Sequence, residues 1–381
     1  MRLLVTLIFC GFSFFSQAQY WIQKSSFGGV GRHRAVGCAT ENKGYLGLGH
    51  VNGSGVDISY KDWWEYDPSS DTWSQKASYP VNNHGATSFV VNNQPCVGGG
   101  SALNGEFFKF DPIQNTWSPI ASCPFFNPGD TQGFSINNKG YVYVGQQMAE
   151  YDPNTNSWTL KATPPVTFGS WTCSFTIEGS GYVKAGTKLF EYKPIHNTWT
   201  QRAEFPGAST GGSYGFSILQ RGYVTCGYVG GLSTVTDQVW SFYPGTNTWQ
   251  LELAFPGTNR RFPVAFAIHN RGYFGTGTNG INLNDFWQYN PTINTSEINE
   301  LSSLSWDVYP NPSTDFLYIH LGDGIGSHTF AEIYDLTGKL MLHTPLNSGE
   351  NVLDIQSLPS GTYVCSVEQN GMKTTKQINI F

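Results

Sequence analysis

Short apolar segments recur six times between residues 34 and 268, and the residues just before them are of types that could bind a ligand. An arginine can hold a carboxylate through two parallel hydrogen bonds, and an aromatic ring offers a flat face to a sugar. We therefore consider an acidic or hydroxylated ligand. The candidate ligand-binding residues are Arg32, His33, Arg34, His84, Asp130, Trp171, Tyr214, Arg260 and Arg261. The alternative is that these side chains brace the junctions between repeats and line a water-filled channel.

Catalytic chemistry finds less support in the sequence. Acid–base catalysis needs a pair of carboxylates or a histidine poised in a cleft. Acidic residues that could serve are present, but no spacing pairs them: Asp57, Asp62, Glu106, Asp237 and Asp285. We find no nucleophile elbow, zinc-protease helix, phosphate loop or calcium loop. We therefore expect no catalytic residue, no metal and no cofactor, and we leave enzyme activity open.

The elements that would position the candidate residues are internal repeats, the first feature to look for in any sequence. One motif reads WEYDPSSDTW from Trp64, FKFDPIQNTW from Phe108, AEYDPNTNSW from Ala149, FEYKPIHNTW from Phe190 and WSFYPGTNTW from Trp240. A sixth, degenerate copy begins at Trp287 and has Ser296 in place of the closing tryptophan. The repeated Trp and Tyr residues occupy equivalent positions, so we interpret them as packing residues.

A second motif alternates with the first. It reads FSINNKGYVYVG from Phe134, FTIEGSGYVKAG from Phe175, FSILQRGYVTCG from Phe216 and FAIHNRGYFGTG from Phe266. We expect its glycine (Gly140 and Gly272, for example) to supply the positive φ of a tight hairpin. Together the two motifs predict four antiparallel strands per unit of about 40–50 residues, which is the pattern of a propeller blade.

The strand that the sixth copy lacks is found at the other end of the chain. YWIQKSSF at residues 20–27 aligns with TWSQKASY at residues 72–79, which matches Trp21 to Trp73. We therefore predict that the N-terminal strand is the outer strand of the sixth blade and lies beside Tyr289. This pairing would close the ring and leave no open sheet edge.

These motifs resemble the Kelch repeat family over residues 20–296. The resemblance implies an all-β, six-bladed Kelch-type β-propeller closed by the N-terminal strand. The sequence departs from the family in the Gly-Gly doublet, which is clear only at Gly98-Gly99. A Kelch-type copper-radical oxidase would need a Tyr/Cys/His constellation, which is not recognisable here.

Loop lengths predict which face of the propeller carries a site. Connections at one end of the blades are short, whereas those at the other end are long: residues 50–62, 100–105, 227–238 and 277–285 within blades and 123–131 between blades. Loops on a rigid scaffold carry function. We therefore expect the candidate residues to meet at the channel mouth on this long-loop face, with the Arg/His group forming one basic lobe opposite Asp130, Trp171 and Tyr214.

The end of the chain has a different pattern. After a polar stretch at residues 297–305, alternating apolar runs predict a small antiparallel β-sandwich at residues 306–381. YPNP from Tyr309, DLTGK from Asp335 and LPSGTY from Leu358 resemble the C-terminal sorting domain of the Bacteroidota type IX secretion system. The resemblance implies engagement with that machinery and export through the outer membrane.

The start of the chain and its composition complete the interpretation. A basic Arg2, an apolar run and a small-x-small site predict a signal peptide at residues 1–18, followed by the propeller at residues 19–296. Only 13% of the residues are charged and the net charge is −6, which argues against nucleic-acid or anionic-membrane binding. No mature transmembrane segment is expected. We interpret the six remaining cysteines as buried small hydrophobic residues.

The sequence thus predicts a secreted or cell-surface binding protein that recognises a glycan or a protein with its long-loop face. The alternative is a carbohydrate-active enzyme on a Kelch propeller, similar to a sialic-acid mutarotase. A purely structural surface component would have no pocket.

Overall fold

The computed structural model describes residues 20–53, 55–125, 131–169, 171–291, 306–321, 329–336, 340–347, 349–369 and 372–381. The expected signal peptide at residues 1–18 and the linker at residues 297–305 lie outside these ranges. Within them the regular secondary structure consists of β-strands. None of the described residues belongs to a helix with the length and apolar character that crossing a bilayer requires.

Residues 20–291 form four-stranded antiparallel sheets, as the repeat motifs predict. The first sheet contains β2 (Val36–Ala39), β3 (Gly44–Gly47), β6 (Trp63–Asp67) and β7 (Thr72–Lys76). The second and third contain β8 (Thr87–Val91), β9 (Gln94–Gly98), β10 (Phe107–Asp111) and β11 (Thr116–Ile120), and β12 (Gln132–Ile136), β13 (Lys139–Val144), β14 (Gln147–Asp152) and β15 (Ser157–Leu160). The fourth and fifth contain β16 (Cys173–Ile177), β17 (Ser180–Ala185), β18 (Lys188–Lys193) and β19 (Thr198–Gln201), and β20 (Tyr214–Ile218), β21 (Arg221–Thr225), β24 (Val239–Tyr243) and β25 (Thr248–Leu251).

The sixth sheet joins the two ends of this region. It contains β26 (Val264–Ile268), β27 (Arg271–Gly275), β28 (Phe286–Asn290) and β1 (Tyr20–Lys24). Strand β1 pairs with β28, and Trp21 lies opposite Tyr289 in the register. The predicted pairing of the N-terminal strand with the last repeat is therefore confirmed.

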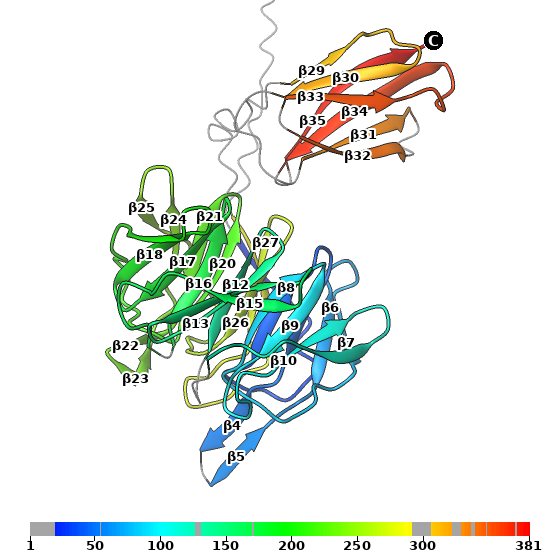
Figure 1. The fold of residues 1–381 in the computed structure, drawn as a ribbon. Coiled ribbons are helices and arrows are strands. Elements are labelled where there is room, and N and C mark those ends of the chain that lie inside the picture. Colours follow the sequence, from blue (N-terminus) through cyan, green and yellow to red (C-terminus); the bar gives the residue numbers. More distant parts are fainter. Residues whose placement is uncertain are drawn as a thin grey trace, which may run out of the picture.

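The first strands of the sheets lie side by side around a common centre (Figure 1). In chain order β2 contacts β8, β8 contacts β12, β12 contacts β16, β16 contacts β20 and β20 contacts β26, and β26 contacts β2. Between neighbouring sheets lie aromatic clusters, such as the one that holds Phe89, Phe107 and Tyr151. The core of this region is thus divided among the junctions between sheets.

The repeated glycine of the second motif has a different role from the one expected. Gly140, Gly222 and Gly272 do not have a positive φ; in the first of these hairpins it is Asn137 and Asn138 that do (49° and 60°). A Cβ built on Gly222 would lie 2.0 Å from the ring of Phe175, and one on Gly140 would lie 2.3 Å from the ring of Phe89. The glycine is needed because a phenylalanine of the preceding sheet packs directly on its Cα.

The closing tryptophan of the first motif links each sheet to the one before it. Its indole N–H donates to the backbone carbonyl four residues after the preceding tryptophan, at N···O distances of 2.7–3.4 Å. The pairs are Trp73 with Ser25, Trp117 with Ala77, Trp158 with Ala121, Trp199 with Ala162, Trp249 with Ala203 and Trp21 with Leu253. Trp21 of β1 therefore makes the sixth bond of a cyclic series.

The asparagine of the same motif acts on the same neighbour. Asn156 Oδ1 accepts the backbone N–H of Ala121 at 2.9 Å, and the hydroxyl of Tyr151 donates to the same oxygen at 2.9 Å. Asn156 has a φ of 48°, a region that asparagine tolerates better than most residues. The Asn and Trp positions of the motif are therefore interpreted as a clamp between sheets.

Two antiparallel ribbons are inserted between second and third strands. β4 (His50–Gly53) pairs with β5 (Val56–Ser59) in the first sheet's connection, and β22 (Tyr228–Val229) pairs with β23 (Gly231–Val235) in the fifth sheet's. Both project from the same side of the sheets (Figure 1). This side is the long-loop face.

Residues 306–381 form two further antiparallel sheets around one core. The first contains β29 (Trp306–Tyr309), β30 (Phe316–Leu321) and β33 (Gly349–Asp354). The second contains β31 (Thr329–Asp335), β32 (Leu340–Leu346), β34 (Gly361–Gln369) and β35 (Met372–Ile380). Leu317, Ile319, Ile333 and Cys365 are buried in the shared core.

The six described cysteines are unpaired and buried, as interpreted from the sequence: Cys38, Cys96, Cys123, Cys173, Cys226 and Cys365.

The glycine contact predicts a steric cost. Gly222→Ala is expected to lower the free energy of unfolding by about 1–3 kcal/mol, because the new methyl group overlaps the Phe175 ring. Gly245→Ala is the control, since a Cβ there meets nothing within 4 Å. Urea denaturation of both variants measures the difference, and equal stability of the two would contradict the packing argument.

The pairing of β1 predicts a contribution from a residue at the far end of the chain. Trp21 packs against Tyr289 and Phe255 at ring distances of 4.8 and 5.1 Å. Trp21→Ala is expected to cost about 3 kcal/mol of stability. Ile22→Ala, on the exposed side of the same strand, is expected to cost less than about 0.5 kcal/mol. Thermal melts of both variants check this, and a neutral Trp21→Ala would show that β1 does not hold the ring.

Candidate functional site

Equivalent backbone positions of five of the sheets lie at the start of the inner strands, and we call this set of residues the crown. Its described members all have positive φ: Arg34 (51°), Gly85 (65°), Trp171 (71°), Gly212 (64°) and Phe262 (55°). This conformation is uncommon for bulky residues. Asp130, the expected member of the third repeat, lies outside the described residues.

Backbone hydrogen bonds join crown residues of neighbouring sheets. The N–H of Gly85 donates to the carbonyl of Arg34 at 3.0 Å, and that of Arg34 donates to Phe262 at 3.3 Å. Phe262 N–H donates to Gly212 at 2.8 Å, and Gly212 N–H donates to Trp171 at 3.0 Å. The left-handed backbone turns each amide toward the next sheet, which places Arg34, Trp171 and Phe262 around one opening.

A small cavity of about 40 Å³ lies at this opening, and we call it the neck. Trp171 is half-buried there, 5.4 Å from the ring of Phe262 and 6.0 Å from that of Tyr228. Its indole nitrogen is buried and has no hydrogen-bond partner. Residues of every inner strand or its approach contribute to the lining: Arg34, Ala35, Gly85, Ala86, Gln132, Trp171, Thr172, Gly212, Ser213, Tyr214, Phe262 and Pro263.

Arg32 does not reach this opening, and the structure favours the bracing role that the sequence left as an alternative. It is fully buried, and its guanidinium forms two hydrogen bonds with the carboxylate of Asp62. Its Nη1 also donates to the carbonyl of Leu48 at 2.9 Å, and its charge lies 4.1 Å from the ring centre of Tyr60. Four of its five N–H donors are used inside the protein, the fourth by Nε to the carbonyl of Val30 at 2.8 Å.

Arg260 repeats the same brace in the last sheet. It is fully buried, and it binds Asp285 with both Nη atoms at 2.6 and 2.7 Å. Burial alone would raise the pKa of Asp285, but the Arg260 guanidinium holds it below its usual range. Trp287 donates to the same carboxylate at 2.8 Å, as Trp64 does to Asp62 at 2.9 Å. Neither arginine can hold an external carboxylate without breaking this brace.

Three histidines form a chain beside the crown. His33 and His50 share a hydrogen bond between their Nε2 atoms at 2.8 Å, and the ring centres of His50 and His84 lie 3.9 Å apart. His33 Nδ1 contacts the amide oxygen of Asn282 at 2.8 Å, and His84 Nδ1 contacts the hydroxyl of Ser59 at 2.8 Å. The chain therefore ties the β4–β5 ribbon to the first, second and sixth sheets.

The histidines are neutral at pH 7. Burial lowers the pKa of His33 to about 4, and the positive charges of Arg34 and Arg261 act in the same direction. Burial and the neighbouring imidazoles lower the pKa of His50 to about 3, and burial with the Arg34 charge lowers that of His84 to about 4. The cluster thus presents hydrogen-bonding imidazoles and not a cationic lobe.

The remaining candidates divide between the neck and its rim. Arg34, Trp171 and Tyr214 line the neck. Arg261 lies on the rim: its Nη1 donates to the carbonyl of Leu232 on β23, and its charge lies 5.8 Å from the ring centre of Phe262. Burial lowers the pKa of Arg261.

Sequence reasoning missed His50, Asn282 and Phe262. His50 and Asn282 lie in long insertions. These insertions do not align from one repeat to the next, so the repeat pattern does not predict where their side chains lie. Phe262 could have been found, because it occupies the crown position next to the predicted Arg261. Among the described residues, no group of three His, Cys, Asp or Glu side chains is arranged to hold a metal ion.

Comparison with known proteins assigns the C-terminal residues of the chain to a family. Residues 307–380 match the family described as secretion system C-terminal sorting domain. The protein is exported to the extracellular space or the cell surface. Its sorting domain engages the type IX secretion machinery.

The solved structure of YjhT, a propeller, matches this chain with a TM-score of 0.59 at 15% sequence identity. The match covers 69% of this chain and 95% of that one. At this identity the likeness shows the fold alone, an all-β propeller. No curated protein matches the sequence.

The histidine chain predicts a loss of stability in acid. The folded pKa values of about 3–4 lie below the unfolded value of about 6.5, so the unfolded chain binds more protons between these limits. The contribution of the cluster is complete above pH 6.5 and is lost as the pH falls toward 4. His50→Gln is expected to remove about 1–2 kcal/mol of the difference in stability between pH 7 and pH 4.5.

Urea denaturation at the two pH values measures this effect, with His196→Gln as the control because His196 is exposed on a turn. Identical pH dependence in wild type and His50→Gln would contradict the assigned burial of the imidazoles.

Proposed function

We propose that this protein is an exported binding protein that uses the long-loop face of a six-bladed Kelch-type propeller to recognise a glycan or a protein. The pairing of β1 with β28 and the cyclic series of indole bonds support closure of six blades by the N-terminal strand. An origin in the Bacteroidota and a cleaved signal peptide belong to the same proposal.

The observation that carries the proposal is the concentration of long insertions on one face, which also carries exposed aliphatic side chains. Both ribbons project there, and the His33–His50–His84 chain holds one of them in place. Val56 and Ile58 on β5, Leu232 on β23 and Ile281 in the sixth sheet's long connection are exposed. Exposed apolar groups held on a rigid frame are typical of a recognition surface.

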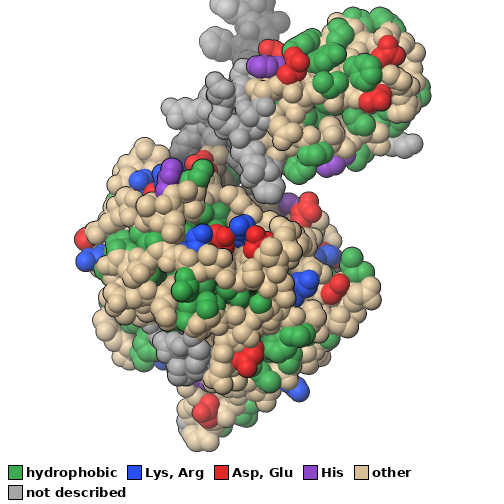
Figure 2. All heavy atoms as spheres, viewed as in Figure 1, with side chains coloured by type: hydrophobic (Ala, Val, Ile, Leu, Met, Phe, Trp, Pro, Cys, Tyr) green, Lys and Arg blue, Asp and Glu red, His purple; other side chains and the backbone are tan. Residues whose placement is uncertain are grey.

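Charge plays a small part in this surface. Figure 2 shows charged side chains of both signs scattered among polar and apolar ones on the visible face. On the long-loop face Arg32 and Arg260 are neutralised by Asp62 and Asp285, and the three histidines are neutral. Arg261, at the rim of the neck, is the cation that supports binding of an acidic group.

The alternative, a carbohydrate-active enzyme similar to a sialic-acid mutarotase, is favoured by the same imidazole chain, which contains potential proton acceptors beside Arg34. Against it, the described lining of the neck holds no carboxylate to act as their partner. The two functions are distinguished by measuring whether the protein converts a bound sugar into a product.

A glycan array that includes sialylated and uronic-acid sugars tests the proposal on the purified secreted protein. Selective binding is expected, and Arg261→Ala is expected to weaken it by about tenfold or more, because a charged hydrogen bond contributes about 1.5–3 kcal/mol. Replacing Ile58 with Asp tests the aliphatic part of the face, and Ile113→Asp, on a turn of the opposite face where the side chain is more exposed than Ile58, is the control.

Binding that Arg261→Ala and Ile58→Asp leave unchanged would contradict the assigned face. Conversion of a bound sugar at a measurable rate would favour the enzyme.

A further inference from the structure

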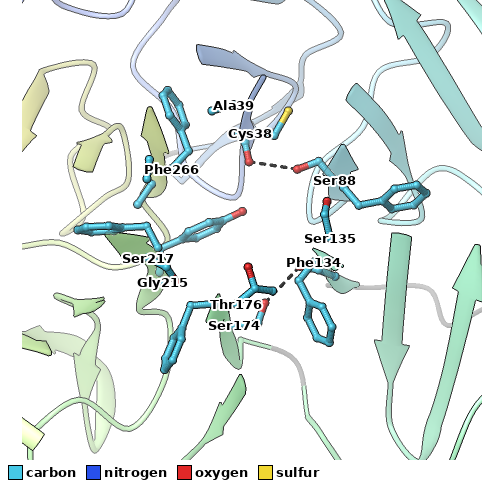
Figure 3. Close-up of a pocket in the computed structure, with 18 of the residues that line it drawn as sticks. Cys38, Ala39, Ser88, Phe134, Ser135, Ser174, Thr176, Gly215, Ser217 and Phe266 are labelled. Carbon is cyan, nitrogen blue, oxygen red and sulfur yellow. Dashed lines mark hydrogen bonds between the residues drawn. The ribbon is translucent and has the colours of Figure 1, made fainter. Parts of the chain in front are cut away.

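The inner strands enclose a second cavity, of about 300 Å³, which we call the chamber. Figure 3 shows Cys38, Ser88, Ser135, Thr176 and Ser217 from five of the inner strands around one space. Phe266 of β26 contributes from the sixth. The chamber is a central feature of the ring and is distinct from the long-loop face.

The chamber wall mixes polar and apolar groups and is uncharged. Its described lining contains hydroxyl, amide and phenol groups beside apolar side chains, and no Asp, Glu, Lys, Arg or His side chain. An ion placed there would exchange part of its hydration for uncharged groups and meet no counter-charge, which is unfavourable. The chemistry of the wall therefore selects neutral, hydrogen-bonding occupants.

Some of these polar groups are used by the wall itself. The hydroxyl of Ser88 donates to the carbonyl of Gly37 at 3.1 Å, and that of Ser174 donates to Gly133 at 3.2 Å (Figure 3). Ser135 Oγ accepts the backbone N–H of Val90 at 2.7 Å. These bonds join neighbouring inner strands and keep the wall rigid.

Other groups have no partner in the protein. Ser217 Oγ is buried without a hydrogen bond. Within the described chain, the side chains of Gln132, Thr176 and Tyr214 line the chamber and make no hydrogen bond to other residues. Burial raises the pKa of Tyr214, so its hydroxyl stays protonated and can donate. Polar groups that line a cavity without a protein partner are normally satisfied by water or by a ligand.

The size of the chamber fits more than isolated waters. About 300 Å³ corresponds to about ten water molecules at roughly 30 Å³ each. A molecule that carries several hydroxyls on a compact ring can replace such a group of waters and keep their hydrogen bonds.

We propose that the chamber binds a small neutral polyhydroxylated molecule of monosaccharide size, held by Thr176, Ser217, Gln132 and Tyr214. This site is independent of recognition by the long-loop face. It takes a ligand without a carboxylate, whereas Arg261 suits an acidic one.

We place the entrance to the chamber at the neck, because Gln132 and Tyr214 line both cavities. The neck holds only about 40 Å³, so a sugar that enters by this route needs Trp171, which lines it, to move aside. The indole nitrogen of Trp171 has no hydrogen bond that would have to break. The movement of this side chain is therefore restrained by its packing against neighbouring rings.

Isothermal titration calorimetry on the full secreted chain tests the proposal with D-glucose, D-galactose, D-mannose and myo-inositol as probes and D-glucuronate as the charged comparison. At least one neutral probe is expected to bind and glucuronate is not. Thr176→Val and Ser217→Ala, which change few atoms, are each expected to weaken binding by about tenfold. Thr200→Val on the exposed strand β19 is the control and is expected to have no effect.

Three results would overturn the proposal: no heat with any neutral probe, binding that both chamber variants leave unchanged, or glucuronate binding as tight as the neutral sugar. Thermal melts establish whether the variants are folded. If Thr176→Val does not fold, Ser217→Ala still tests the proposal. Stopped-flow measurements on Trp171→Ala are expected to show about tenfold faster association, and an unchanged rate would place the entrance elsewhere.

Discussion

The indole hydrogen bonds of six tryptophans are the interaction on which the rest of the propeller depends. Each donates to a carbonyl of the preceding sheet, and the series returns to its start because Trp21 donates to Leu253. A sheet in this arrangement has little core of its own, since its aromatic residues lie in the junctions with its neighbours. Every junction therefore has to be made before any one of them is fully stable, which is why the first strand of the chain must return to the last sheet.

The same demand for junctions explains why half of the expected basic lobe is not available to a ligand. Arg32 and Arg260 occupy equivalent places, and both are enclosed by an aspartate, two carbonyls and aromatic rings. Lys184 serves the fourth junction from a different strand: its ammonium donates to the carbonyl of Ser209 and lies 4.4 Å from the ring centre of Phe205. A cation over an aromatic ring is thus a recurring way of filling the outer part of a junction.

The crown connects this architecture to the candidate sites. Left-handed backbone at the equivalent position of five sheets lets neighbouring sheets exchange amide hydrogen bonds, and it also aims Arg34, Trp171 and Phe262 at the opening. The neck is consequently a product of how the inner strands meet one another. The long-loop face lies outside the crown and the chamber lies inside it, so this set of residues separates a mixed apolar and cationic surface from a neutral, hydroxyl-rich interior.

The repeat motifs by themselves determined the four-stranded units and the return of residues 20–27 to the last sheet, because both depend on local patterns of alternation, turns and spacing. Separate motifs at the end of the chain indicated the sorting domain. Inner-strand positions counted from the repeats also selected Trp171, Tyr214 and Arg34 as candidates, and these three residues line the neck. Only the tertiary structure decided which arginines are available, that His50 joins His33 and His84, and that Gly222 is glycine because of Phe175. These outcomes depend on contacts between sheets. At a junction, the burial of a side chain and the residue opposite it decide what that side chain can bind. The spacing of residues within a single repeat encodes neither its burial nor that neighbour.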